Sequence, residues 1–395
     1  MIRALRPLLP LLPLLLIAGC ANFSYYAQAI GGQMDILAKS RPIDEWIDDP
    51  ATTPETRQKL ATVLTLREFA TRELELPDNR SYRNYADLER PFAVWNVFAT
   101  PELSLQPREW CFAVAGCVSY RGYFAQAEAD RFAAELKQQG DDVYVGGVAA
   151  YSTLGWFSDP MLNTVLRRSE TEIAGILFHE LAHQKLYVKN DSAFNESFAT
   201  VVELEGVKRW LLQQGKPEEF QRYQKNIKRR EEFVAFVLRH RERLAKIYAA
   251  NLSDNEKRVA KAHILEELRS NYAALKTRWG GYEGYDSWFT QDLNNARLVS
   301  IGLYHQHVAA FQELLAQHNG NCVSFYRAVH ELARKPRLDR DKALHLLSVS
   351  ASRQITWCLL RAYHSLYGIS EAIVLLQTPL LLRKLDNADI ERLLC

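Results

Sequence analysis

Apolar residues recur at helical spacing along most of the chain, and one short stretch departs from that spacing. Positions 173, 176, 177 and 181 hold isoleucine or leucine on one face of a helix, with no proline between them. Val143–Tyr151 instead consists of β-branched, aromatic and small residues, which is typical of a strand. The pattern therefore predicts an α+β fold that is mainly α-helical.

Proline, glycine and capping residues divide the helical pattern into segments. Residues 22–76 read as helices interrupted at prolines, and Thr53-Pro54 starts the last of them, because proline suits the first helical position. A further helix over 125–139 ends at Gly140. Residues 206–279 are helical and heavily charged, which indicates a solvated helix face.

The helix beginning near residue 171 carries the sequence His-Glu-x-x-His. His179 and His183 are four residues apart, so both side chains lie on one face and can bind one metal ion. Glu180 stands beside them, where it can accept a proton from an attacking water. The alternative is a buried helix with two incidental histidines, but burying Glu180 without a partner would be costly.

A third metal ligand is expected from a second helix. Lys189 stands six residues after His183, where a third histidine would lie, so that class of site is excluded. Glu196 lies 13 residues after His183 (196 minus 183), which leaves room for a turn and a returning helix capped by Asp191 or Ser192. Two histidines and Glu196 would form a zinc site of the His₂Glu type.

Glu203 is the rival carboxylate. It follows Glu196 by seven residues, two turns later on the same face, so the two lie roughly 10 Å apart and cannot both bind one ion. We expect Glu196 to be the ligand and Glu203 to orient a ligating imidazole. A solvated helix face is the alternative for Glu203.

Composition and charge narrow the class of protein. Hydrophobic residues make up 48% and charged residues 24%, which supports a sizeable globular core. The formal charge is +2 and the sequence has no polybasic block, so nothing in the charge indicates that the protein binds nucleic acid.

The first residues predict export and a lipid anchor. Met1–Gly19 has a positive start followed by a proline-broken apolar stretch, too short to span a membrane. Ile17–Cys20 resembles a lipobox, in which Cys20 is lipidated and holds the protein to a membrane. Ala21 favours the outer membrane of a bacterial cell envelope, facing the periplasm. An ordinary secretory signal is the alternative.

Five further cysteines lie beyond Cys20, and export permits disulfides. Cys111 and Cys117 are close in sequence, and Gly116 suits a turn between them, so we expect a local disulfide. A metal site is the weaker alternative, because no histidine is near. The remaining cysteines, Cys322, Cys358 and Cys395, leave an odd count, which implies one free thiol or an intermolecular bond.

The residues around Glu196 resemble a known family. Asn195-Glu196-Ser197-Phe198-Ala199 looks like the Asn-Glu-x-Phe-Ala signature of gluzincin aminopeptidases. With Ala150–Pro160 and the His-Glu-x-x-His motif, the chain is similar to a family of bacterial zinc aminopeptidases. The resemblance covers roughly residues 20–345, with 144–203 its specific part. It implies one Zn²⁺ per chain, action at peptide N-termini, and Asn195 beside the metal ligand.

The same resemblance implies a substrate site. A small antiparallel sheet would pack on the zinc helix, and its edge strand would bind the peptide backbone, with Gly146 and Gly147 allowing close approach. A plain core strand is the alternative. Tyr304 is the expected oxyanion donor, because the family resemblance extends to its surroundings. Other candidates are Tyr187, His305 and His307.

The expected organisation has three parts: a signal peptide over 1–19, a zinc metallopeptidase over 20–349 with its metal core at 143–210, and a tail at 350–395 without an assigned role. The expected function is a zinc aminopeptidase acting on peptides in the cell envelope. The alternatives are a zinc endopeptidase and a peptide-binding lipoprotein without catalysis. Glu180 argues against the last, because a structural zinc site usually has four protein ligands.

Overall fold

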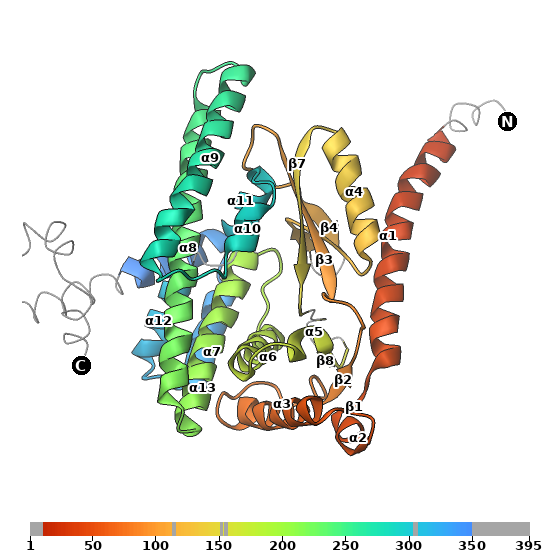
Figure 1. The fold of residues 1–395 in the computed structure, drawn as a ribbon, viewed down its shortest axis with the longest axis vertical. Helices are drawn as coiled ribbons and strands as arrows, with labels where there is room; N and C mark the ends of the chain where they lie inside the picture. Colours follow the sequence, from red (N-terminus) through yellow and green to blue (C-terminus); the bar gives the residue numbers. More distant parts are fainter. Residues whose placement is uncertain (1–10, 113–115, 151–152, 154–156, 303–306, 350–395) are drawn as a thin grey trace, which may run out of the picture. The chain divides into compact units, whose positions relative to one another are not determined.

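The computed structural model describes residues 11–112, 116–150, 153, 157–302 and 307–349, with the backbone alone for 11–24 and 302. Helices predominate, and short strands form small sheets (Figure 1). The prediction of a mainly helical α+β fold is confirmed. The chain divides into two units, Met1–Gln306 and His307–Cys395, and each is described by itself.

The first unit begins with helices α1 (Leu11–Lys39), α2 (Ile43–Asp48) and α3 (Pro54–Arg72). Helix α3 begins at the predicted position, since the Thr53 side chain accepts a hydrogen bond from the amide of Thr56. Among the described helices, none is long and apolar enough to cross a membrane.

The main sheet is antiparallel and has the strand order β6–β3–β7. Its strands are β3 (Val94–Pro101), β6 (Arg121–Tyr123) and β7 (Asp141–Val148). The predicted strand at Val143 begins two residues earlier, because Asp141 and Asp142 still pair with the end of β3. Its predicted end, Tyr151, lies outside the described residues.

The other described strands are β1 (Arg41–Pro42), β2 (Asn84–Ala86), β8 (Met161–Leu162), β4 (Trp110–Phe112) and β5 (Gly116–Val118). Strands β1, β2 and β8 form a mixed sheet in which β2 and β8 run parallel. Strands β4 and β5 form a hairpin.

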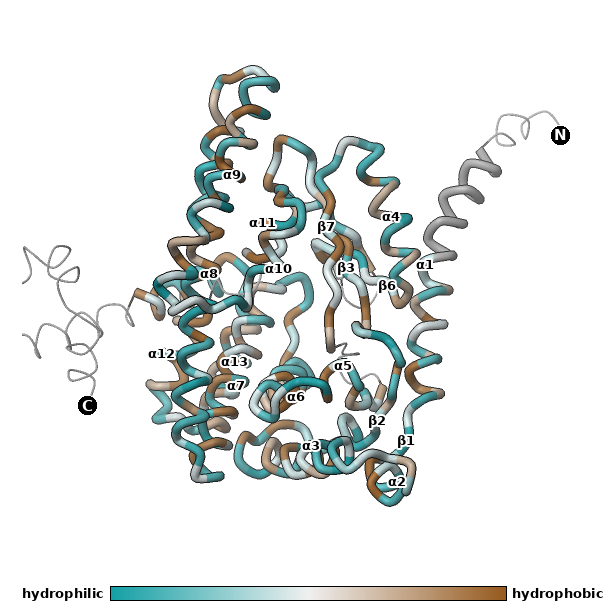
Figure 2. Tube along the Cα trace, in the orientation of Figure 1, coloured by the Kyte–Doolittle hydropathy of each residue, from teal (hydrophilic) through white to brown (hydrophobic). Residues whose placement is uncertain are grey.

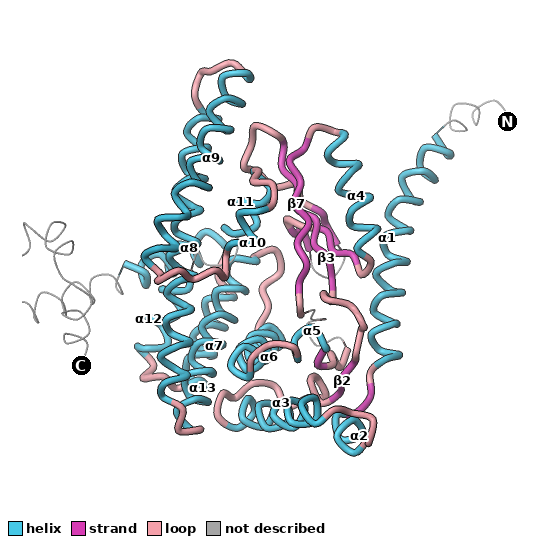
Figure 3. The backbone as a smooth tube through the Cα atoms, viewed as in Figure 1, coloured by secondary structure: helices cyan, strands magenta, loops and turns pink. Residues whose placement is uncertain are grey.

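The two faces of the main sheet have different neighbours. One face packs on α4 (Gln126–Gln138) through a core made of Trp95, Val97, Ala99, Val143, Ala129, Ala133 and Leu136. On the other face, the rings of Phe98 and Tyr144 stack with centroids 6.0 Å apart. Helix α11 (Asn295–Gly302) contacts β3 and β7, so the strands lie between α4 and α11 (Figure 3).

Helix α5 (Asn163–Leu166) leads into α6 (Glu170–Lys185) and α7 (Ser192–Gln213), which pack closely on each other. Gly206 makes this approach possible: a Cβ there would lie 2.6 Å from the ring of Phe178 and 2.7 Å from Leu74. Helix α3 packs on α6 as well.

Helices α8 (Pro217–Ala249) and α9 (Asp254–Arg278) pack side by side and are followed by α10 (Asp286–Thr290). Hydrophilic and hydrophobic segments alternate along both long helices (Figure 2). The hydrophobic side buries a core that includes Phe233, Val237, Leu268 and Phe289. The charged stretch predicted at 206–279 therefore covers the end of α7 and the two long helices α8 and α9, which have one apolar side each.

The second unit contains α12 (Val308–Gln317), α13 (Cys322–Ala333) and a helical stretch at 337–349. Cys322 is buried at the start of α13. Cys358, Cys395 and the apolar segment 373–382 lie outside the described residues.

Candidate metal centre

Helix α6 presents its two histidines because its two ends and its apolar side fix its orientation. Ser169 and Glu172 form a capping box at its start. Ile173, Leu177 and Leu181 are completely buried. His179 and His183 lie one turn apart, and their side chains keep 18% and 8% of their surface exposed.

The turn after α6 returns the chain so that α7 faces the histidines. Asn190 adopts the left-handed conformation (φ 63°), and the Asp191 side chain caps α7 by accepting a bond from the Phe194 amide. Asn195 is buried, and its side chain accepts from the amide of Val188 and donates to its carbonyl, both at 2.8 Å. Asn195 thus braces the turn, next to Glu196.

Glu196 lies between the two imidazoles. Its carboxylate oxygens are 3.2 Å from His179 Nε2 and 3.6 Å from His183 Nε2, and one ligand atom from each residue lies within 4.8 Å of the others. In a tetrahedral zinc site with bonds of about 2.0–2.2 Å, two ligand atoms stand about 3.3–3.6 Å apart. The three residues therefore have the chemistry and the spacing to hold a metal ion.

The imidazole of His183 is suited to donate a lone pair. Burial lowers the pKa of His183 to about 4, so the ring is neutral near pH 7. Its Nδ1 is buried and has no hydrogen-bond partner among the described residues. For His179, burial alone would lower the pKa, but hydrogen bonds to Glu196 and Glu203 raise it well above its ordinary value.

Glu203 lies on the opposite side of the His179 ring from Glu196. Its Oε2 is 3.1 Å from His179 Nδ1, so the two carboxylates contact different nitrogens of one imidazole. With a metal ion at Nε2, the Nδ1–H group would donate to Glu203. A Cβ at Gly175 would lie 3.4 Å from the Glu203 side chain, at ordinary van der Waals distance.

Helix α8 supports Glu203 through residues that the sequence did not single out. The Tyr223 hydroxyl donates to Glu203 Oε1 (3.4 Å), and Arg230 Nη1 lies 4.0 Å from the same oxygen. Burial alone would raise the pKa of Glu203. The hydrogen bond and the charge of His179, the charge of Arg230 and the hydrogen bond of Tyr223 lower it by more, so the pKa is below its ordinary value. Tyr223 and Arg230 are seven residues apart on one helix face, but this spacing alone does not connect them with Glu203.

Glu180 stands beside the metal-binding group without a partner of its own. Its carboxylate has no hydrogen bond or ion pair to any described residue. Burial raises the pKa of Glu180 to about 7; His179 opposes the shift, while Glu196, Asp159 and Glu203 add to it. A carboxylate with a pKa near neutral can both accept and release a proton at pH 7.

Tyr120 was missed by the sequence analysis and reaches the same group. Burial raises the pKa of Tyr120, and the charges of Glu196, Tyr187 and Glu180 raise it further, so that the phenol stays protonated. Tyr120 follows the β4–β5 hairpin, in which Cys111 and Cys117 form a disulfide. The Cys117 amide donates to the Asn190 side chain (3.1 Å), which ties this hairpin to the turn between the metal-binding helices.

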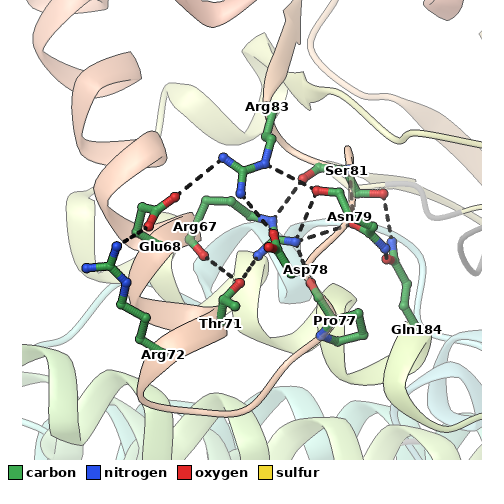
Figure 4. Close-up of polar contacts among 10 residues, drawn as sticks. All are labelled: Arg67, Glu68, Thr71, Arg72, Pro77, Asp78, Asn79, Ser81, Arg83 and Gln184. Carbon is green, nitrogen blue, oxygen red and sulfur yellow. Dashed lines mark hydrogen bonds and ion pairs between the residues drawn. The ribbon is translucent and has the colours of Figure 1, made fainter.

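A polar network holds the end of α6 in place (Figure 4). Arg67 of α3 is completely buried and donates to the carbonyls of Pro77, Asn79 and Ser81. The Asn79 side chain then donates to Gln184 Oε1 (2.8 Å), the residue after His183. The loop that follows α3 is thereby bonded to the metal-binding helix.

The other predicted site residues are not members of the His179, His183 and Glu196 group, and some of them lie outside the described residues. Gly146 and Gly147 lie on β7, an edge strand whose main packing partners are α4 and α11. Tyr187 is 36% exposed; burial and the charge of Glu196 raise its pKa. Tyr304 lies outside the described residues, as does the side chain of Cys20.

The fold and this centre define a mainly helical α+β protein in which two histidines and one glutamate form a group that could hold a metal ion. Residues 24–344 match the family described as Putative aminopeptidase, so the chain belongs to that family. No curated protein and no solved structure matches the chain.

Proposed function

We propose that the protein is a zinc-dependent aminopeptidase that removes N-terminal residues from peptides in the bacterial cell envelope. The observation that carries the proposal is that ligand atoms of His179, His183 and Glu196 lie within 4.8 Å of one another. The carboxylate of Glu180, which bonds to none of the described residues, belongs to the same helix as the two histidines. Family membership supports the peptidase activity. A third protein ligand, rather than a fourth, leaves a position open for chemistry.

Zinc, when bound, would polarise the scissile carbonyl and lower the pKa of water. Glu180 would accept the proton of the attacking water and deliver it to the leaving amine. Glu203 would hold the His179 ring in its orientation, and α8 would hold Glu203 through Tyr223. The partial exposure of Glu196 and His179 gives a substrate access to the group.

Tyr120 is the described residue best suited to donate a hydrogen bond to the developing oxyanion. We expect Tyr120→Phe to lower kcat by about 10²–10³-fold while KM changes little, because such a bond forms only in the transition state. The measurement is steady-state hydrolysis of a short peptide by the zinc-loaded enzyme. Tyr187→Phe is the matched control and should have the smaller effect; the reverse order would assign the donor role to Tyr187.

The edge strand β7 offers a place for the substrate backbone. Gly147 is exposed on it, and the loop that follows leads to Asp159, whose charge acts on Glu180. A peptide could therefore pair with β7 and reach the metal centre with one end. The three carboxylates around Glu180 favour a positively charged group there, as the free α-ammonium of an aminopeptidase substrate would be.

The test combines metal content with substrate form. The mature protein should contain one zinc per chain, and His179→Ala or His183→Ala should lose it. It should hydrolyse peptides with a free N-terminus and spare the N-acetylated forms of the same peptides. Hydrolysis of both forms would indicate an endopeptidase. If both variants keep one zinc per chain, the metal is bound elsewhere.

We also propose that lipid on Cys20 anchors the protein to the outer membrane. Cys20→Ala is expected to abolish lipidation and to release the protein from the membrane, because the lipid is the proposed anchor. Metabolic labelling with a fatty acid and fractionation of the cells would measure both effects. A Cys20→Ala protein that stays in the membrane fraction would contradict the proposal.

A further inference from the structure

Arg297 is a buried cation that forms no ion pair with an acidic side chain of the described residues, although the charge of Asp292 acts on it. It lies on α11, is 3% exposed, and its Cζ stands 4.6 Å from the ring centroid of Tyr144 and 5.0 Å from that of Trp288. Nη1 donates to Oε1 of Gln291 (2.6 Å), whereas Nε is buried without a hydrogen-bond partner. Stacking on two rings offsets only part of the cost of burying a charge, so an anion would be bound favourably here.

Another arginine of the same chain shows what Arg297 lacks. Nε and Nη2 of Arg108 bind the two carboxylate oxygens of Asp141 at 3.0 and 2.9 Å. This edge of the guanidinium matches the geometry of a carboxylate. In Arg297 the same edge makes no hydrogen bond or ion pair with the described residues. It is therefore available to a carboxylate supplied from outside the chain.

Next to Arg297, the edge of β7 has a free segment. Val148 O accepts a bond from Ala93 N, so this residue faces β3, and alternate residues of an antiparallel strand face opposite ways. The outward carbonyl of Val143 accepts from Asn294 Nδ2 (3.0 Å), and that of Ala149 accepts from Thr164 Oγ1 (2.6 Å).

Between these two bonds, the outward backbone groups of Val145 and Gly147 bond to none of the described residues. An extended peptide could therefore add to β7 over this short segment. The bonds at Val143 and Ala149 close the segment at both ends.

A row of aromatic rings connects the metal centre to Arg297. Tyr120, which lies in the field of Glu180 and Glu196, has its ring 5.6 Å from that of Phe98. Phe98 is the direct partner of Tyr144 in the sheet, and their rings stack at 6.0 Å. Arg297 stacks on Tyr144 at the far end of this row. Because Phe98 and Tyr144 are cross-strand partners, this row crosses the sheet, whereas the free segment runs along β7, whose later end leads toward Asp159, a residue whose charge acts on Glu180.

We propose that Arg297 binds the C-terminal carboxylate of a short peptide that lies along the free edge of β7. This inference rests on the proposed aminopeptidase function. A strand antiparallel to β7 would have its N-terminus near Gly147, at the metal-centre end, and its C-terminus near Val143 and Arg297. Four residue steps of β-strand span ~13 Å, so the preferred substrates are peptides of about three to five residues.

The test compares peptides of one sequence that end in a free carboxylate or in an amide, using the zinc-loaded wild-type enzyme. We expect kcat/KM to be about 10- to 100-fold higher for the free acid at the preferred length, as for a charge-assisted bidentate contact. The preference should disappear for peptides of about ten residues, whose C-terminus lies beyond Arg297. Equal rates for acid and amide at every length would overturn the inference, whether or not any variant folds.

Arg297→Gln should remove the difference between acid and amide, and Arg297→Lys should restore part of it. Arg258→Gln is the matched control: Arg258 is an exposed arginine paired with Glu102, and this variant should keep the full preference. Retention of the preference in Arg297→Gln would also overturn the inference. Failure of the wild-type enzyme to cleave either form would instead contradict the proposed aminopeptidase function.

Discussion

Glu180→Gln is expected to leave the metal bound and to lower kcat by about two to four orders of magnitude, the range that general-base catalysis supplies. Glu180 has no bond to His179, His183 or Glu196, so its replacement removes none of the metal-binding atoms. Glutamine keeps the size of the side chain but cannot accept the proton. The measurement is kcat for a short peptide together with zinc content by atomic absorption.

The matched control for Glu180→Gln is Glu170→Gln. Glu170 lies on the same helix, but its carboxylate binds Lys216 and Thr62 away from the metal-binding group. This variant should keep both zinc and turnover. If Glu180→Gln keeps full activity with its zinc, another residue is the base, and the position of Glu180 beside the ligands has no role in proton transfer.

The part of the site that local spacing determines could be predicted from the sequence. His179 and His183 share a helix face because they are four residues apart, and the structure places both beside Glu196. The returning helix could be predicted because Asp191 is a capping residue, and it does cap α7. Helices α6 and α7 both begin at capping hydrogen bonds between residues only three positions apart, which is why their starts could be predicted locally.

The parts of the site that depend on distant packing could not be predicted. Tyr120 lies 76 positions before Glu196 in the chain (196 minus 120), and nothing in its local sequence indicates that the charge of Glu196 acts on it. Tyr223 and Arg230 read as parts of a charged helix face, because their contact with Glu203 depends on how α8 packs on α7. The parallel pairing of β2 with β8 also joins residues far apart in sequence.

Asn195 illustrates the limit of a motif. Its place beside Glu196 implied a role next to the metal ligand, whereas its side chain bonds to both backbone groups of Val188. The amide is suited to this because it carries a donor and an acceptor on one group. Asn195 thus stabilises the turn that brings Glu196 to the histidines. The sequence pattern alone does not distinguish this role from a direct contact of Asn195 with the metal-ligand side chains.

Glu196→Gln and Glu203→Gln should have different effects on the metal. Glu196 contacts Nε2 of both histidines, whereas Glu203 contacts only Nδ1 of His179. Glu196→Gln replaces an anionic ligand oxygen with a neutral one, so the variant should lose most of its zinc on dialysis. Glu203→Gln can still accept a bond from the His179 Nδ1–H group, so it should lose only about 10- to 100-fold in zinc affinity or activity.

Competition with a chromophoric chelator would give the zinc affinity of each variant, and circular dichroism would check that each is folded. Glu205→Gln is the control on the same helix, because Glu205 pairs with Arg209 and should leave zinc affinity unchanged. If Glu203→Gln loses the metal and Glu196→Gln retains it, then Glu203 is the ligand. In that case the ion would be bound through Nδ1 of His179, the nitrogen that already contacts Glu203.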